Sequence, residues 1–341
     1  MPNVLVLGAA GAIGAHAVRA LLAEGWRVRA LARAGSDLRG LDGLPLELVR
    51  GDLRDSAALA RALEGCAALV HAAGAYPTSR VSVAGAIAAG LAGVEPPLEA
   101  ARAAGVVRAV YVSSLSTIGP ARRARARHGR PPRAPALVPL ADERDEGAWP
   151  HEGAYSAAKR AMEAAALSVC VAGLPLVVVN PTLCLGEHDH KPTSGRMVHE
   201  TLRGRLPLLD APLNVVYTGD VGLGIARALE RGRPGERYLL GGANTTAAWL
   251  LRQIAFEGGV PPPRLWLPMQ VARRGAHAAD VARRLSGRPA FSVTAVDLLA
   301  RGQHFDCGKA RRELGLPEAT SAVETVRRAV AWFQRSREVA R

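Results

Sequence analysis

Short apolar runs alternate with amphipathic stretches over the first half of the chain. The apolar runs predict buried strands at 3–7, 27–32, 46–52, 67–74 and 108–114. The stretches between them predict helices, among them 12–22, 56–64, 98–104 and 155–172. Strands that alternate with helices form a parallel sheet covered on both faces, which binds ligands at the carboxyl ends of its strands. The pattern therefore predicts a doubly wound α/β fold.

The alternation loosens after residue 181. We predict a cofactor-binding domain over 1–181 and a mainly substrate-binding region over 182–341, with strands near 213–220 and 236–242 returning to the first domain. Further helices are predicted at about 195–203, 252–256, 270–285 and 321–336. Asp220 is expected to cap the N-terminus of a helix.

Three glycines, Gly8, Gly11 and Gly14, join the first predicted strand to its helix. Glycine permits a tight turn and the close approach of a phosphate, and the helix that follows offers unpaired N–H groups and the positive end of its dipole. The spacing GxxGxxG differs from the more usual GxGxxG, so the turn alone also fits a turn without a ligand. We predict a pyrophosphate site that includes Ala12 and Ile13.

Arg33 follows the second predicted strand. An acidic residue about 20 positions beyond the glycines would bind the ribose 2′-hydroxyl of NAD, whereas an arginine there accommodates the 2′-phosphate of NADP. NADP(H) is therefore the expected cofactor and NAD(H) the second choice. The alternative interpretation is an ordinary exposed arginine in an arginine-rich chain.

Other cofactor contacts are expected at the ends of the third and fourth strands. Asp52 is a candidate acceptor for the adenine amino group, with Leu53 beside it. The fourth strand ends in small residues that would let a cofactor lie against the backbone, namely Ala72, Ala73 and Gly74.

The fifth predicted strand ends in Ser113 and Ser114, and Tyr155 and Lys159 open a helix some forty residues later. Residues at i and i+4 share one face of a helix, so the phenol and the ammonium point the same way. A nearby cation would lower the pKa of Tyr155 and equip it to give and take a proton near neutrality. The pattern predicts acid–base chemistry at Tyr155.

Six motifs in this order resemble the extended branch of the short-chain dehydrogenase/reductase superfamily: Gly8-x-x-Gly11-x-x-Gly14, Gly51-Asp52, His71-Ala-Ala-Gly74, Tyr111-Val-Ser-Ser114, Tyr155-x-x-x-Lys159 and Asn180-Pro181. Within that branch the chain is most similar to dihydroflavonol-reductase-like proteins and hopanoid-associated sugar epimerases. The resemblance covers nearly the whole chain and implies a Rossmann fold. It also implies that Tyr155 is the catalytic acid/base, that Lys159 tunes it and binds the nicotinamide ribose, and that Ser114 holds the substrate oxygen. Ser113, Asn180 and Pro181 complete the expected cofactor contacts.

Together these motifs predict an NADP(H)-dependent oxidoreductase that reduces a carbonyl to an alcohol, or runs the reverse reaction. One alternative is an NAD-dependent sugar-nucleotide epimerase or dehydratase. Another is a cofactor-binding regulator that has lost the chemistry. The apolar bias of residues 182–300 favours a lipid-like, polyketide or aromatic carbonyl substrate over a free sugar.

One predicted helix departs from the family. The family carries there an Asn in an Asn-Val-x-Gly-Thr pattern that supports a proton relay through water, and the matching stretch here is Gly90-Leu-Ala-Gly93-Val94. Pro96 and Pro97 fall where this helix should continue, so we expect it to restart at Pro96 or to be kinked. The resemblance implies a homodimer that pairs through the fourth and fifth helices of the fold, and the prolines weigh against it.

The 341-residue chain has a formal net charge of +14 and only 4% aromatic residues. Such a charge could attract nucleic acid, an anionic membrane or a phosphorylated substrate. A GC-rich genome, which encodes much Ala, Gly, Pro and Arg, explains it better, and no basic stretch is interleaved with aromatics, so nucleic-acid binding is not expected. No apolar run is long enough to span a bilayer, and the chain starts directly with a strand, which predicts a cytoplasmic protein.

Metal and disulfide chemistry are not expected. The four cysteines are far apart and form no CxxC pair, namely Cys66, Cys170, Cys184 and Cys307. His188 and His190 form one HxH motif without a third ligand of clear spacing. The basic stretch 121–133 and the acidic stretch 142–146 are expected to form a solvated, poorly ordered insertion, or alternatively a lid that steers anions.

Overall fold

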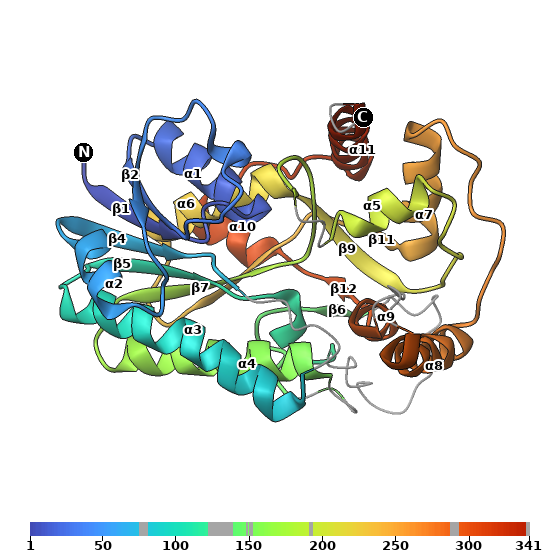
Figure 1. Ribbon diagram of the computed structural model, residues 1–341, viewed down its shortest axis with the longest axis horizontal. Helices are drawn as coiled ribbons and strands as arrows, with labels where there is room; N and C mark the ends of the chain where they lie inside the picture. The colour runs from blue at the N-terminus through green and yellow to red at the C-terminus, as the bar shows by residue number, and fades with distance from the viewer. Residues whose placement is uncertain are drawn as a thin grey trace, which may run out of the picture.

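The computed structural model describes residues 1–74, 81–121, 139–147, 149, 153–190, 194–286 and 293–338. A large sheet flanked by helices forms one part of the molecule, and a smaller group of short strands and helices faces the carboxyl ends of its strands (Figure 1). This arrangement places the loops that follow the strands between the two parts.

The large sheet has seven strands, all paired in parallel, in the order β10-β7-β5-β4-β1-β2-β3. They are β1 (Asn3–Leu7), β2 (Arg27–Ala32), β3 (Leu46–Arg50), β4 (Cys66–His71), β5 (Arg108–Val112), β7 (Leu176–Pro181) and β10 (Arg237–Leu240). The predicted doubly wound sheet and its first five strands are confirmed. The strand order reverses between β1 and β4, which is where such sheets bind their ligands.

Side chains alternate between the two faces of this sheet and build two separate cores. Val4 and Val6 of β1 point to the face covered by α1 (Ala12–Ala23) and α6 (Thr218–Arg231). Leu5 and Leu7 point to the other face, which is covered by α2 (Ser56–Leu63), α3 (Val83–Ala103) and α4 (Ala154–Val171). Figure 1 shows α1 above the sheet and α3 and α4 below it.

Helix α3 runs without a break through Pro96 and Pro97, so the expected restart at Pro96 is wrong. A proline inside a helix costs about 3 kcal/mol or more, because it removes a backbone donor and crowds the preceding turn. Val94 and Leu98, on either side of the prolines, are fully buried in the core shared with α4. Each such buried apolar side chain contributes about 1.5–3 kcal/mol, which offsets most of this cost.

The smaller part contains a three-stranded sheet in the order β11-β9-β8. Its elements are β8 (Leu183–Leu185), α5 (Arg196–Thr201), β9 (Pro212–Tyr217), β11 (Ala243–Thr246), α7 (Ala247–Glu257) and α11 (Ala322–Glu338). The strand near 236–242 joins the large sheet as β10, as predicted, but the strand near 213–220 does not. It is β9, and it stays in the smaller sheet because Leu213 and Val215 pack against α7 and α11.

The remaining elements belong to neither of these two sheets. They are the short helices η1 (Arg39–Leu41) and η2 (Leu115–Thr117), the strands β6 (Leu140–Ala141) and β12 (His304–Phe305), and the helices α8 (Met269–Ser286), α9 (Val293–Ala300) and α10 (Gly308–Leu314). Within the part of the chain that the structure describes, no helix is both long and apolar enough to cross a membrane.

Asp220 is not the cap of a helix, contrary to expectation. Helix α6 starts two residues earlier, directly after β9, and its N-cap is Tyr217. The Asp220 carboxylate accepts hydrogen bonds from the backbone N–H of Thr320 (2.7 Å) and from its hydroxyl (3.0 Å). It therefore ties α6 to the segment that leads into α11.

The charged stretches between η2 and α4 are only partly described. Residues 122–133 of the basic stretch lie outside the described residues. In the acidic stretch, Glu143 and Asp145 are buried, and the Glu143 carboxylate accepts the N–H of Leu239 (2.8 Å). The acidic stretch is thus packed against β10 and is not the solvated insertion that was expected.

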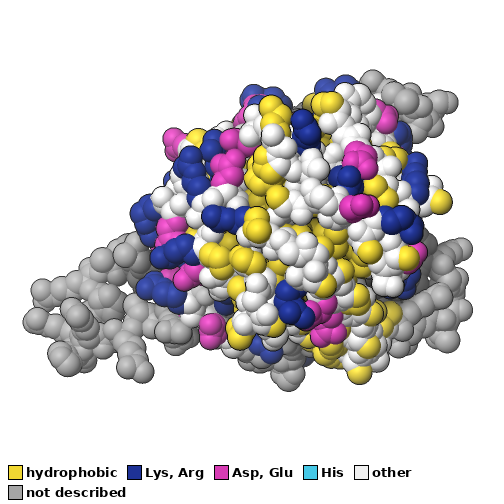
Figure 2. Space-filling view, turned by 90° about the vertical axis from the view of Figure 1, so that its left-hand side faces the viewer, with side chains coloured by type: hydrophobic (Ala, Val, Ile, Leu, Met, Phe, Trp, Pro, Cys, Tyr) yellow, Lys and Arg dark blue, Asp and Glu magenta, His cyan; other side chains and the backbone are white. Residues whose placement is uncertain are grey.

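Figure 2 shows the end of the molecule where the strands begin. Lysine and arginine side chains on this face are scattered among acidic ones, and apolar side chains occupy its centre. The positive charge of the chain is therefore not gathered into one patch on this face.

Candidate active site

The turn after β1 has the shape of a phosphate cradle. Gly8 has a positive φ of 81°, and a Cβ there would lie 2.5 Å from the backbone N of Ala73. A Cβ on Gly14 would overlap the carbonyl of Gly8. Both glycines are therefore required by the fold itself.

Gly11 differs from its two neighbours in this turn. A Cβ there would meet nothing closer than the Gly8 carbonyl oxygen at 3.4 Å, so this side of the turn is open. Gly11 is also the N-cap of α1, where no side chain caps the helix and no acidic residue stands in the first turn. The N–H groups at Ala12 and Ile13 thus start a helix whose positive end is uncompensated, which suits a pyrophosphate.

The loop after β4 lies between the glycine turn and the catalytic candidates. The N–H of Ala72 donates to the carbonyl of Leu7 (2.9 Å), and Ala73 lies against Gly8. Gly74 is exposed, and a Cβ there would be 3.4 Å from Lys159 Nζ. The structure therefore brings the glycine turn, this loop and Lys159 together.

The expected adenosine contacts lie at the ends of β2 and β3. The Asp52 carboxylate is held by the guanidinium of Arg54 through two contacts of 3.1 Å, which lower the pKa of Asp52 to about 2. Leu53 is half-buried against the core between the large sheet and the helices α2, α3 and α4. Arg33 is exposed, and its guanidinium forms no ion pair with any residue that the structure describes.

Tyr155, Ser114 and Lys159 form the candidate catalytic group. The Tyr155 hydroxyl donates to Ser114 Oγ (3.3 Å), joining the first turn of α4 to the end of β5. Lys159 is one turn further along α4 and is buried, which lowers its pKa to about 8, while the carboxylate of Glu163 acts in the opposite direction. The predicted serine, tyrosine and lysine are thus adjacent in space.

The pKa of Tyr155 behaves differently from the sequence expectation. Burial raises the pKa of the phenol, the neighbouring Cys184 adds to this, and the hydrogen bond with Ser114 lowers it. Among the groups described around the phenol, Ser114 is therefore one that favours the phenolate.

Ser113 and Asn180 end neighbouring strands of the sheet. The N–H of Ser113 donates to Val179 O (2.8 Å), and its buried hydroxyl has no partner among the described residues. Asn180 is fully buried and its amide Nδ2 contacts Ser114 O (3.3 Å), whereas its Oδ1 is unpartnered within the described chain. Pro181, which follows, is buried beside Leu240 of β10.

These observations fit a dinucleotide. The open turn at Gly11 follows β1 and the unpartnered hydroxyl of Ser113 follows β5, the two strands on either side of β4, which leads into the loop with Ala72 and Ala73. Buried polar atoms without partners are rare in folded proteins and often mark a ligand or water site. The residues present therefore suit a pyrophosphate at one end and a ribose and nicotinamide at the other.

The place of the missing relay asparagine is filled by packing. A Cβ on Gly90 would lie 2.8 Å from the Met162 sulfur, so the Met162 side chain of α4 occupies the space that a side chain at position 90 would need. His71 Nε2 lies 2.9 Å from the carbonyl oxygen of Gly93 and joins β4 to α3 instead. Burial lowers the pKa of His71 to about 4.

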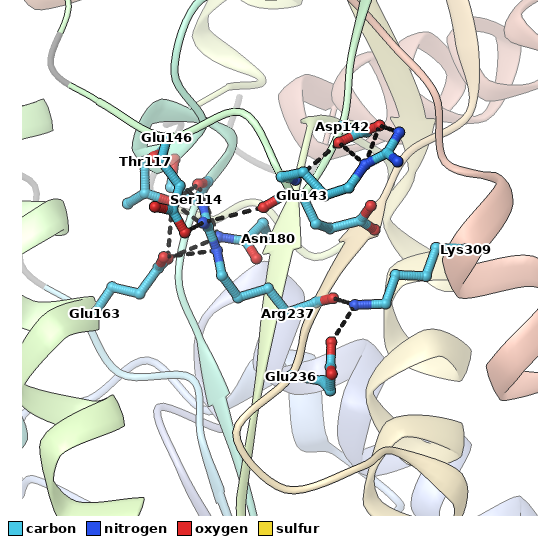
Figure 3. A network of polar contacts seen from close by, with 11 residues as sticks. Ser114, Thr117, Asp142, Glu143, Glu146, Glu163, Asn180, Glu236, Arg237 and Lys309 are labelled. Carbon is cyan, nitrogen blue, oxygen red and sulfur yellow. Dashed lines mark hydrogen bonds and ion pairs between the residues drawn. The ribbon is translucent and has the colours of Figure 1, made fainter.

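Three residues that were not predicted as site residues lie around Ser114: Thr117, Glu163 and Arg237 (Figure 3). Glu163 follows Lys159 by four residues, just as Lys159 follows Tyr155, so a further step of the same spacing could have indicated it. Arg237 comes from a distant strand and no local pattern marks it.

The histidines after β8 pack against aromatic rings. The His190 ring lies 5.2 Å from that of Trp332, and the His188 ring lies 5.3 Å from that of His16. In the described part of the chain, no three His, Cys, Asp or Glu side chains converge as metal ligands do.

Comparison with known proteins gives consistent matches over most of the chain. The model of the NAD dependent epimerase/dehydratase family matches residues 4–241. A Synechocystis sp. protein provisionally named a dihydroflavonol 4-reductase is 32% identical over 342 residues, covering 96% of this chain and 94% of that protein. Sterol demethylase protein B of Methylococcus capsulatus is 33% identical over 343 residues, covering 97% and 98%. Among solved structures, a double mutant of dTDP-glucose 4,6-dehydratase from Streptomyces venezuelae with NAD bound is 26% identical, with a TM-score of 0.73 over 98% of each chain.

Proposed function

The chain belongs to the NAD dependent epimerase/dehydratase family, and from this premise we propose that it is an NADP(H)-dependent oxidoreductase that interconverts a carbonyl and an alcohol. The observation that carries the proposal is the contact between the Tyr155 hydroxyl and Ser114 Oγ (3.3 Å), with Lys159 on the same face of α4. This is the arrangement that general acid catalysis at a carbonyl oxygen requires.

In the proposed reaction, the substrate oxygen lies between Ser114 and Tyr155. Ser114 donates a hydrogen bond to that oxygen and orients it, and Tyr155 gives it a proton. The bound cofactor supplies the hydride to the carbonyl carbon. Lys159 provides a positive charge on the same helix face, which favours the phenolate that remains. The reverse reaction uses Tyr155 as the base.

The preference for NADP is proposed on Arg33. Its exposed guanidinium, at the end of β2, is free to bind a 2′-phosphate, and no acidic residue stands at that position. An apolar carbonyl substrate is proposed on the sequence of residues 182–300 and on the names of two relatives, which refer to a dihydroflavonol and to a sterol. A homodimer through α3 and α4 remains a prediction.

A second candidate is an NAD-dependent sugar-nucleotide dehydratase or epimerase. It is favoured by the likeness to the dTDP-glucose 4,6-dehydratase that holds NAD. Such an enzyme would use Tyr155 and Lys159 in the same way but would return the hydride within one catalytic cycle.

A binding titration with NADPH and NADH, followed by turnover assays on steroid ketones, aryl ketones and β-keto esters, tests the proposal. We expect tighter binding of NADPH and loss of NADPH absorbance with at least one ketone class. Oxidised cofactor that copurifies in a tightly held form, together with no net turnover of any ketone, would favour the dehydratase or epimerase instead.

A further inference from the structure

The carboxylate of Glu163 is the centre of a buried polar network around the backbone of Ser114 (Figure 3). Its side chain is 7% exposed. Oε2 lies 2.8 Å from the Thr117 hydroxyl and 2.7 Å from Asn180 Nδ2, and Oε1 lies 3.0 Å from Arg237 Nε. One carboxylate on α4 thus binds side chains from η2, β7 and β10.

Two of these partners also contact the backbone of Ser114. The Thr117 hydroxyl lies 2.9 Å from the Ser114 carbonyl oxygen, and Asn180 Nδ2 lies 3.3 Å from it. Thr117 has one hydroxyl proton to donate and Asn180 has two amide protons. Hydrogen bonds to a charged carboxylate are the stronger ones, so Thr117 gives its single proton to Glu163, and Asn180 gives one proton to Glu163 and has the other for Thr117 Oγ1 (2.9 Å) or the Ser114 carbonyl oxygen. Glu163 therefore fixes how both side chains lie against Ser114.

Arg237 compensates the charge of this buried carboxylate. Its side chain is 13% exposed, and its guanidinium also donates to the carbonyl oxygens of Glu143 (3.2 Å) and Thr117 (3.4 Å). Arg237 therefore closes the network from below and ties it to the acidic stretch before α4. Lys309 donates to the carbonyl oxygen of Arg237 (2.6 Å) and holds the strand that carries it.

We propose that Glu163 is a positioning residue for the active site. Together with Arg237, it fixes the end of β5 so that Ser114 Oγ stays within hydrogen-bond reach of Tyr155. The same helix face then carries the acid/base at position i, the cation at i+4 and the carboxylate that holds their partner at i+8. This inference rests on the proposed function, because it assigns the network to the Ser114–Tyr155 contact.

A positioning role for Glu163 predicts the direction in which the pKa of Tyr155 changes when Glu163 is replaced. The described groups that act on or respond to the phenol include Cys184 on β8 and Tyr111 on β5, and Lys159 lies one turn further along the same helix. The Ser114 hydrogen bond lowers the pKa of Tyr155, so loosening Ser114 should raise it. Removing the negative charge of Glu163 would by itself lower the pKa of a nearby phenol, because the phenolate is then repelled less. An upward movement therefore reports positioning and not charge.

The experiment compares Glu163→Gln with Glu143→Gln, a matched control. Glu143 is also buried and also bonds to β10, but its carboxylate contacts neither Thr117 nor Asn180. We expect Glu163→Gln to lower kcat about 10- to 100-fold, as a small misplacement of a reacting group does. We expect KM and NADPH binding to stay within about twofold, because the ground-state contacts remain. The control should keep its kcat.

A double variant, Glu163→Gln with Arg237→Gln, separates positioning from stability. Removing both charges leaves no lone buried ion, so its thermal midpoint should lie above that of Glu163→Gln. Its kcat should stay low, since Thr117 and Asn180 still lack the carboxylate. If kcat recovers along with the midpoint, or if Glu143→Gln lowers kcat equally, Glu163 has only a structural role and the inference is overturned.

A spectroscopic readout keeps the inference testable when no substrate is known. Ultraviolet titration of the protein and of its Tyr155→Phe form isolates the Tyr155 phenol by difference, with and without Glu163→Gln. We expect an upward shift of its midpoint in Glu163→Gln. An unchanged or lower midpoint contradicts the inference, whereas absence of turnover in the unmodified protein contradicts the proposed function alone.

Discussion

At the adenosine end of the proposed cofactor site, each paired carboxylate binds an arginine two residues away, whereas at the catalytic end the paired groups come from different elements. Asp37 pairs with Arg39 and Asp52 with Arg54, and both arginines are well exposed. At the catalytic end, Glu163 binds a hydroxyl 46 residues earlier in the chain and an amide 17 residues later, all of them buried.

The difference has physical consequences. Exposed ion pairs contribute little to stability and are screened by salt, so the adenosine end can exchange partners when a ligand arrives. A buried network is strong when every member is satisfied and costly when one is removed. Substitutions at the catalytic end should therefore change chemistry or stability steeply, and those at the adenosine end should shift cofactor choice with little effect on the fold.

The largest effect is expected for Tyr155→Phe. Loss of the phenolic proton should lower kcat about 10²- to 10⁴-fold, since that is the range general acid catalysis contributes. NADPH binding should persist. Steady-state kinetics on the best ketone found measures the first quantity and a binding titration the second.

Tyr238→Phe provides the control for that substitution. Tyr238 is fully buried, and its hydroxyl bonds to Glu313 (2.9 Å), away from Ser114. The Tyr238→Phe variant should be somewhat less stable than the unmodified protein and should keep its kcat. Equal loss of kcat in both variants would show that Tyr155 acts through the fold and not through its proton.

The buried His71 allows the catalytic end to be tested through the pH dependence of protein stability. His71 is neutral in the folded protein because burial between β4 and α3, beside Lys159, lowers its pKa from 6.5 to about 4. The unfolded chain binds a proton there below pH 6.5, so stability is full above that pH and falls as the pH drops toward 4. Between pH 7 and pH 5 the free energy of unfolding of the unmodified protein should fall by about 2 kcal/mol more than that of His71→Gln.

Urea unfolding of both forms at pH 7, 6 and 5 measures this difference. The other histidines with lowered pKa values, His16, His188 and His190, are present in both forms and cancel. Parallel pH dependence in the two forms would mean that His71 is readily protonated in the native state and that this end of the site is less tightly sealed than the structure indicates.

The same contrast explains what could be predicted from the sequence. The strands β1 to β5, the glycine turn and the i,i+4 pair of Tyr155 and Lys159 depend on neighbours in the chain, and local patterns indicated each of them. The path of α3 through Pro96 depends on buried contacts with α4, which local propensity does not contain. Arg237 was missed for the same reason, since its partner Glu163 lies on another element.

Charge pairing shows a second limit of prediction from the sequence. Asp52 was predicted as an adenine acceptor, and in the structure its carboxylate is already held by Arg54. The two residues are adjacent enough in the chain for this pair to be foreseen, but a sequence pattern does not say which of several partners a carboxylate chooses. The predicted adenine contact of Asp52 stays a prediction.

A smaller effect is expected at the glycine turn, where the fold and the ligand make separate demands. Gly11→Ala adds a methyl group no closer than 3.4 Å to the chain, so the free energy of unfolding should change by at most about 1 kcal/mol. The methyl enters the open side of the cradle, so the Kd for NADPH should rise about 10-fold, equal to about 1.4 kcal/mol. Gly14→Ala should instead destabilise the protein, because its methyl overlaps the Gly8 carbonyl. Unfolding curves and binding titrations on both variants separate the requirement of the fold from that of the ligand. Unchanged NADPH binding in Gly11→Ala would show that the pyrophosphate does not bind at this turn.

The smallest effect, and the one that bears most directly on the adenosine end, is expected for Arg33→Ser. Because the Arg33 guanidinium is exposed and unpaired within the described residues, its removal should leave stability unchanged. A charged contact to a 2′-phosphate contributes about 1.5 kcal/mol, so the preference for NADPH over NADH should fall about 10-fold while NADH binding stays the same. Added salt should reduce the preference of the unmodified protein for NADPH toward that of the variant, since an exposed contact is screened.

Arg27→Ser, at the exposed start of the same strand, removes an identical charge from the opposite end of β2 and should leave the preference for NADPH intact. If the two variants behave alike, Arg33 is an ordinary surface arginine, and cofactor choice must be assigned to the buried end of the site instead.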